Sequence, residues 1–253
     1  MSSRGLAATY SIERITAPTQ ERFYRDYVKP AIPVIIEDAI VRWRATTHWS
    51  AAYLKAVPGH RRVPVEVSPD HEFAVPERIG HDLIHTTFGR YIDYLVSPGD
   101  ASGVTYYLAQ LNMARYVPEL RQDVVRPYVM PPAGYMRSPF LWMGRGNNAS
   151  RLHYDDYDNL YVVLTGRKHI TLFPPEDRDY LYPYDIPKRR HFSRVDLRRP
   201  DFERFPKLAY TRPYECVLCR GDMLYIPYRW WHYLRSHGLN IAVNWWWVEP
   251  DDQ

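Results

Sequence analysis

The sequence predicts a mainly β fold of the jelly-roll kind, with helices packed around its N-terminal side. From about residue 103 onward, short segments rich in β-branched and aromatic residues follow one another, and Gly or Pro interrupts several of them. The chain also combines 22 Tyr and 8 Trp with 22 Pro, which suits short strands joined by rigid turns. Such strands are typical of sandwiches and barrels, including jelly rolls. They are GVTYYLAQ, FLWMG, NLYVVLTG, KHITLFPP, ECVLCRGDMLYIP and NIAVNWWWVE.

Length and composition indicate one ordered domain. We expect residues 1–253 to form it, with an N-terminal α/β elaboration over 1–102 and the jelly-roll core over 103–253. A hydrophobic content of 45% argues against global disorder, and a net charge of +4 does not by itself imply nucleic acid. No signal-peptide or membrane-spanning segment is recognisable, so a soluble protein of the cytoplasm, without a membrane partner, is expected.

The N-terminal third mixes helix and strand signals. Apolar residues at helical spacing predict one helix in TQERFYRDYVK and another from His85 to Val96. Ser50 is expected to cap a short helix that runs through Leu54. PAIPVIIED and RRVPVEVS are interpreted as strands. Within the later β region, the polar and basic stretch 176–210 is interpreted as a long insertion loop, which in compact domains is usually functional or disordered.

The segment RLHYDDYDNL carries the main chemical signal. On an extended strand His153 and Asp155 lie two residues apart, so both side chains leave the same face. His232 follows a later strand-like segment, GDMLYIP, and supplies a third ligand. Two His and one carboxylate on one face of a metal leave positions open, which suits non-haem Fe(II) oxygenases. By strand parity Asp156 and Asp158 point away; the alternative is a buried His that is hydrogen-bonded to a neighbouring Asp.

A lysine falls on the apolar face of a later segment. Gly166 separates NLYVVL from RKHITLF, which predicts a hairpin. In the second of these strands Lys168 shares its parity with Ile170 and Leu172, so its ammonium is expected inside, where a lone charge is costly. The distal carboxylate of 2-oxoglutarate is a suitable partner. Alternatively, Lys168 lies at the strand start and reaches water.

Two further features of the β region leave alternatives open. Asn159 and Tyr161 share the parity of the predicted ligands, and Asn244 lies in a strand among apolar residues, where it needs an interior partner or a structural hydrogen bond. Cys216 and Cys219 form a C-x-x-C, but on a strand they point to opposite faces, so we interpret them as ordinary thiols rather than a zinc or redox site.

The segment from His153 to Trp247 resembles the JmjC-type cupin hydroxylases, among them the asparaginyl hydroxylase that inhibits hypoxia-inducible factor and the tRNA wybutosine hydroxylases. The shared pattern includes H-Y-D, N-L, G-R-K, L-F-P-P, G-D-M-L-Y-I-P, W-W-H and V-N-W-W, in this order. The resemblance implies a double-stranded β-helix that binds Fe(II), 2-oxoglutarate and O2. It implies iron ligation by His153, Asp155 and His232, co-substrate binding by Lys168, Tyr107, Asn159, Asn244 and Ser150, and a substrate-side position for Trp246.

The resemblance implies a dioxygenase, and we expect it to hydroxylate a peptide or protein side chain. The alternatives are a hydroxylase of modified tRNA, an N-methyl-lysine demethylase, and a non-catalytic cupin that binds metal or ligand; the triad with Lys168 argues against the last. The basic run around Arg189 and Arg190 is either a solvated face or the border of the active-site mouth. In the second case it would attract an acidic peptide or a phosphate backbone.

Overall fold

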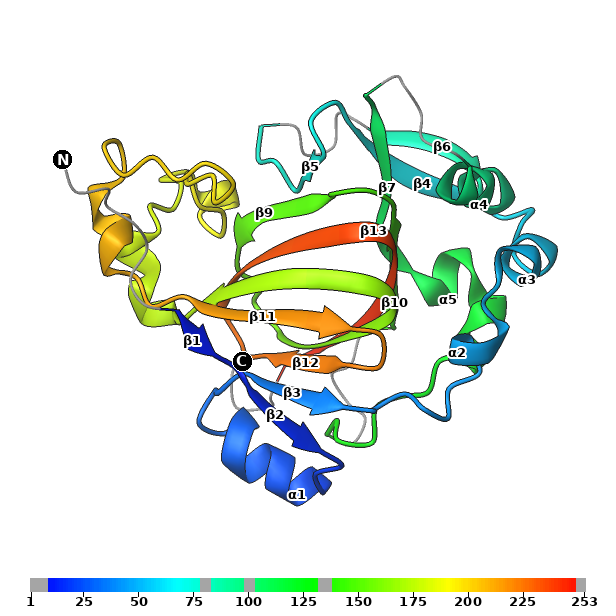
Figure 1. Ribbon diagram of the computed structural model, residues 1–253, viewed down its shortest axis with the longest axis horizontal. Helices are drawn as coiled ribbons and strands as arrows, with labels where there is room; N and C mark the ends of the chain where they lie inside the picture. The colour runs from blue at the N-terminus through cyan, green and yellow to red at the C-terminus, as the bar shows by residue number, and fades with distance from the viewer. Residues whose placement is uncertain (1–8, 78–82, 98–102, 132–137, 249–253) are drawn as a thin grey trace.

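The computed structural model describes residues 9–77, 83–97, 103–131 and 138–248. Their strands join into one 13-stranded sheet (Figure 1). At its centre β10 (Asp158–Phe173) and β13 (Trp231–Trp247) pair antiparallel along their whole lengths. The predicted mainly β class is confirmed. Strands from the predicted N-terminal elaboration pair into the same sheet as those of the predicted core.

Strand β10 is one long bent strand, so the hairpin predicted at Gly166 is wrong. The register with β13 shifts on both sides of Thr165, which marks the bend. Gly166 has φ +84°, and a Cβ atom there would lie 2.2 Å from the carbonyl oxygen of Leu239. Glycine is therefore required because the bend needs both a left-handed backbone and a close approach of β13.

The bend lets β10 and β13 serve two layers. The first half of β10 pairs with β12 (Met223–Ile226), and its second half pairs with β11 (Tyr214–Cys219). Likewise β13 pairs with β9 (Ala149–His153) near its start and with β8 (Phe140–Gly144) near its end. The sheet continues from β8 through β7 (Thr105–Asn112), β4 (Arg62–Ser68) and β6 (Leu83–Thr87), and on the other side from β12 to β3 (Val34–Glu37) and β2 (Glu13–Thr16).

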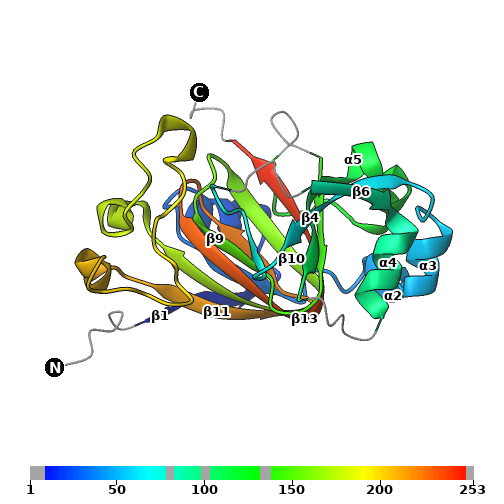
Figure 2. The same ribbon diagram turned by 90° about the horizontal axis from the view of Figure 1, so that it is seen from above.

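Helices α2 (Ala45–His48), α3 (Ala51–Ala56), α4 (Phe88–Val96) and α5 (Met113–Tyr116) gather at one end of the sheet (Figure 2), while α1 (Gln20–Phe23) lies apart from them beside β2 (Figure 1). Ser50 caps α3 (Ala51–Ala56), as predicted, by accepting a 3.2 Å hydrogen bond from the Tyr53 amide. Helix α4 (Phe88–Val96) buries the predicted apolar face, but it begins at Phe88 because the preceding residues belong to β6. The remaining elements are β1 (Tyr10–Ser11), a π-helical turn (Tyr24–Val28), β5 (Glu72–Phe73) and 3₁₀ helices at Pro118–Asp123, Pro175–Tyr180, Pro187–Arg189 and Pro206–Tyr210.

The predicted insertion loop 176–210 is a packed segment. Its backbone pairs with β9, where the Ser193 amide donates to the Leu152 carbonyl at 2.9 Å. Buried Glu72 binds Arg198 of the segment and Arg151 of β9, each at 2.8 Å. These contacts hold the segment along the strand that ends at the predicted metal site.

Two other sequence predictions concern the cysteines and membrane-spanning segments. Both cysteines are free, and burial raises the pKa of Cys216 to about 12, as expected for an ordinary unreactive thiol. Among the described residues, no helix has the length and apolar character needed to cross a membrane.

Candidate active site

Three predicted ligands meet at one point of the jelly roll. His153 ends β9 and lies directly opposite His232 of β13, with ring centroids 4.3 Å apart. A carboxylate oxygen of Asp155 is 3.7 Å from Nε2 of His232. The ligand atoms of all three residues lie within 4.8 Å of one another, which is compatible with one metal ion.

Backbone carbonyls orient both imidazoles for metal binding. The Nδ1 of His153 donates to the Arg151 carbonyl at 2.6 Å, and the Nδ1 of His232 donates to the Trp230 carbonyl at 3.0 Å. Because a carbonyl only accepts, each Nδ1 carries the proton and each Nε2 keeps its lone pair for a metal. Burial and the neighbouring His232 lower the pKa of His153 to about 4, so it is a neutral ligand at physiological pH.

Asp155 reaches the site by a different route from the predicted one. Strand β9 ends at His153, so Asp155 lies in the connection to β10 and not on an extended strand. The competing carboxylates are engaged elsewhere, as predicted. Asp158 accepts a 2.5 Å hydrogen bond from the Tyr225 hydroxyl, and Asp156 pairs with Arg229 at 2.7 Å.

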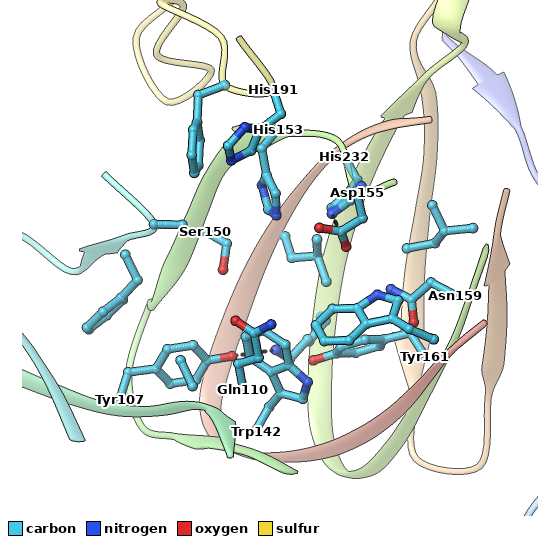
Figure 3. A pocket seen from close by; sticks show the side chains of 18 of the residues that line it. Tyr107, Gln110, Trp142, Ser150, His153, Asp155, Asn159, Tyr161, His191 and His232 are labelled. Carbon is cyan, nitrogen blue, oxygen red and sulfur yellow. Dashed lines mark hydrogen bonds and ion pairs between the residues drawn. The ribbon is translucent and has the colours of Figure 1, made fainter. Parts of the chain in front are cut away.

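A cavity of about 360 Å³ extends from the triad between the two layers. Figure 3 shows His153, Asp155 and His232 at one end of it, and Tyr107 and Tyr161 at the other. Lys168 also lines it. The cavity is thus large enough for a small co-substrate that touches both the metal site and the buried lysine.

Lys168 is buried, as its strand parity predicted. It is 3% exposed, and its ammonium donates to the Tyr107 hydroxyl at 3.2 Å. Burial lowers the pKa of Lys168 to about 7, and no carboxylate among the described residues lies within ion-pair distance of it. The end of the cavity therefore offers a desolvated cation that an anionic ligand would stabilise.

The predicted polar residues occupy two positions relative to the cavity. Ser150 and Asn159 line it, as does Trp246. Asn244 instead lies behind this lining, where its side-chain amide donates to Oδ1 of Asn159 at 3.0 Å and accepts from the Trp142 indole at 2.7 Å. Asn244 thus fixes the Asn159 amide, and direct co-substrate contact by Asn244 is not what the geometry indicates.

The basic run lies beside the cavity without lining it. Among the described residues, His191 and Phe192 of the insertion line the cavity, whereas Arg189 and Arg190 do not. Arg189 is half-buried and Arg190 is exposed. Their substrate-side role stays a prediction.

Sequence reasoning missed two polar residues of the cavity wall. Glu66 lies on β4 directly opposite Tyr107, and both side chains line the cavity. Gln110 lies in β7 at a register shift, with φ +50°, an uncommon conformation for a residue other than glycine. The alternation in RRVPVEVS placed Glu66 between apolar residues. Only the pairing of β4 with β7 shows that the Glu66 side chain lies on the cavity face, opposite Tyr107.

A jelly roll with a two-histidine, one-carboxylate centre defines a metal-binding cupin, and comparisons with known proteins agree. The model of the cupin-like domain family matches residues 20–253. The chain is 37% identical to lysine-specific demethylase 8 of Danio rerio over 96% of this chain and 59% of that protein. It is 31% identical to the bifunctional peptidase and (3S)-lysyl hydroxylase JMJD7 of Homo sapiens, over 90% of this chain and 81% of that protein.

A third relative is the tRNA wybutosine-synthesizing protein 5 of Gallus gallus, which is 29% identical over 90% of this chain and 74% of that protein. The chain spans between half and two thirds of the length of the lysine-specific demethylases that it matches. It belongs to the cupin-like, JmjC-type family of enzymes, with the His-Asp-His iron-binding triad of that family in place.

Proposed function

We propose that the chain is an Fe(II)- and 2-oxoglutarate-dependent dioxygenase that hydroxylates a cationic side chain of a peptide or protein. One observation carries the chemistry: a single cavity joins the triad to a buried lysine that lacks a carboxylate partner among the described residues. The donor set fits Fe(II), because it leaves metal positions open. The lysine end fits the far carboxylate of a 2-oxo diacid.

Each residue has a defined task in this proposal. His153, Asp155 and His232 would hold Fe(II), while Lys168 and Tyr107 would hold the distal carboxylate of 2-oxoglutarate. When bound, iron and co-substrate supply O2 activation and hydroxylation of a C–H bond, with release of succinate and CO2. Asn244 keeps the Asn159 amide in one orientation.

The substrate class follows from Glu66. Burial raises the pKa of this carboxyl to about 7, and no cation among the described residues lies within ion-pair distance of it. A lysine or arginine side chain entering the cavity would restore its ionisation. Trp142 and Trp246 line the same cavity and suit the methylene stem of such a side chain. The lysine named for several relatives is compatible with this class.

Two alternatives keep the same chemistry. A modified tRNA is the alternative suggested by the wybutosine-synthesizing relative and by the basic residues beside His191. We favour peptide because the net charge is only +4 and no RNA-binding module is recognisable in the sequence. An N-methyl-lysine is the other alternative, since demethylation needs the same oxidation of a C–H bond. A non-catalytic cupin has no use for a desolvated lysine opposite the triad.

The test offers the protein Fe(II), 2-oxoglutarate and either peptide or RNA pools, followed by mass spectrometry. We expect peptides to gain the mass of one oxygen atom at a lysine or arginine. Loss of one methylene from methylated lysine would indicate a demethylase. A gain of oxygen in tRNA alone would refute the peptide proposal, and no product in any pool would favour the non-catalytic alternative.

A further inference from the structure

Tyr161 places a hydroxyl group at the closed end of the cavity. It lies in the first half of β10, opposite Asn244 of β13 and Leu224 of β12, and its side chain lines the cavity (Figure 3). The residue is only 3% exposed. Its ring packs in an apolar cluster with residues such as Val163 and Ile170, a role that phenylalanine would fill equally well. The hydroxyl is therefore the feature that needs an explanation.

That hydroxyl is buried next to the Tyr107 hydroxyl, and among the described residues neither Tyr107 nor any other group makes a hydrogen bond of standard length and angle to it. Burial raises the pKa of Tyr161, and the neighbouring Tyr107 acts in the same direction. Both hydroxyls are therefore protonated at physiological pH and act as donors. Buried polar groups nearly always have well-formed hydrogen bonds, so a cavity-facing hydroxyl whose contact with Tyr107 falls short of one points to a ligand.

The neighbours of Tyr161 identify the chemistry of this ligand. The Lys168 ammonium lies 5.1 Å from the centroid of the Tyr161 ring and 5.7 Å from that of Tyr107. Lys168 donates one hydrogen bond to Tyr107 and has two more N–H groups. Because Tyr107 accepts from Lys168, its own O–H is available to donate. This end thus gathers several donors and one positive charge. The carboxyl that faces it, Glu66 opposite Tyr107, has its pKa raised to about 7 by burial, so it carries only part of its charge at neutral pH.

A carboxylate matches this set, since it only accepts and has about four lone-pair sites. We propose that the Tyr161 hydroxyl binds the distal carboxylate of the co-substrate together with Lys168 and Tyr107. The assignment rests on the proposed function, because it takes the co-substrate to be a 2-oxo diacid. Tyr161 is then a binding residue that makes the cavity select a co-substrate with a terminal carboxylate over a shorter 2-oxo acid.

Two inert ligands that differ only in the distal carboxylate test the assignment. N-oxalylglycine carries the distal carboxylate, whereas N-methyloxamate has the same chelating end and lacks it. Calorimetry would measure both ligands on Mn(II)-loaded wild type, Tyr161→Phe and Tyr128→Phe, where Tyr128 is a surface tyrosine that is 55% exposed. Tyr161→Phe keeps the packed ring and removes only the hydroxyl, so the fold should persist.

We expect Tyr161→Phe to weaken N-oxalylglycine binding by about 10- to 100-fold, in the range for one hydrogen bond to a charged group. The affinity for N-methyloxamate should stay within about twofold, and Tyr128→Phe should match wild type for both ligands. An equal loss of affinity for both ligands would show that Tyr161 has only a structural role and would overturn the assignment. Unchanged N-oxalylglycine binding would also overturn the assignment of Tyr161, while leaving the proposed function intact. If wild type binds neither ligand, the proposed function fails and this assignment fails with it.

Discussion

Replacing Lys168 with methionine should make the ligand-free protein more stable while it weakens co-substrate binding. Burial moves the pKa of Lys168 from 10.5 to about 7. Since each pKa unit is worth about 1.4 kcal/mol, the lysine costs about 4 kcal/mol of folding free energy at pH 7. Methionine fills a similar volume without a charge but loses the hydrogen bond to Tyr107. We therefore expect a net gain in unfolding free energy of about 1–4 kcal/mol.

The gain should depend on pH in a defined direction. The folded pKa of Lys168 lies below its unfolded value, so the unfolded chain binds more protons between pH 7 and 10.5. The stability of wild type therefore rises with pH across this window, and the advantage of Lys168→Met should fall below about 1 kcal/mol at pH 10. Urea unfolding of both metal-free proteins at pH 7 and pH 10 measures the two differences.

The same variant should bind N-oxalylglycine about 10- to 150-fold more weakly, since it loses a charge-assisted contact worth about 1.5–3 kcal/mol. A Lys168→Met protein that is less stable than wild type at pH 7 would refute the electrostatic reasoning. Unchanged affinity for N-oxalylglycine would show that the ammonium does not meet the ligand.

Three further predictions test other parts of the site. His232→Ala should abolish stoichiometric Fe(II) binding and leave the circular dichroism spectrum unchanged; equal metal binding by the variant would refute the triad. Glu66→Gln should raise the KM for a basic peptide by about 10- to 150-fold without weakening N-oxalylglycine binding, and an unchanged KM would remove Glu66 from substrate recognition. Reversing charge at Arg189 and Arg190 should raise KM without altering uncoupled 2-oxoglutarate turnover; normal processing of substrate would show that these arginines form only a solvated face.

Local sequence patterns predicted those parts of the site that depend on strand parity and residue type. The order of His153, Asp155 and His232 predicted one metal centre, and the alternation around Lys168 predicted its burial. The period of apolar residues likewise predicted the buried face of α4. The burial of Lys168 and the buried face of α4 are local signals, because each depends only on residues a few positions apart, whereas the distant His232 was assigned from its residue type and from the resemblance.

What the sequence could not predict depends on long-range pairing and backbone bends. Gly166 breaks a strand pattern in the same way whether the chain turns back or bends within one strand, and only the close approach of Leu239 distinguishes the two. Glu66 reaches the cavity wall because β4 pairs with β7. Such a strand pairing joins segments far apart in the chain, and no local sequence pattern indicates it.

The most direct test of the central claim is anaerobic visible absorption spectroscopy of the protein with Fe(II) and 2-oxoglutarate. A 2-oxo acid that chelates Fe(II) through two adjacent positions gives a charge-transfer band, and the open positions of the triad should allow that chelation. We expect the band in wild type and its loss in His232→Ala, with Zn(II) giving none in either protein. A wild-type protein that binds Fe(II) and yet shows no band with 2-oxoglutarate would contradict the account.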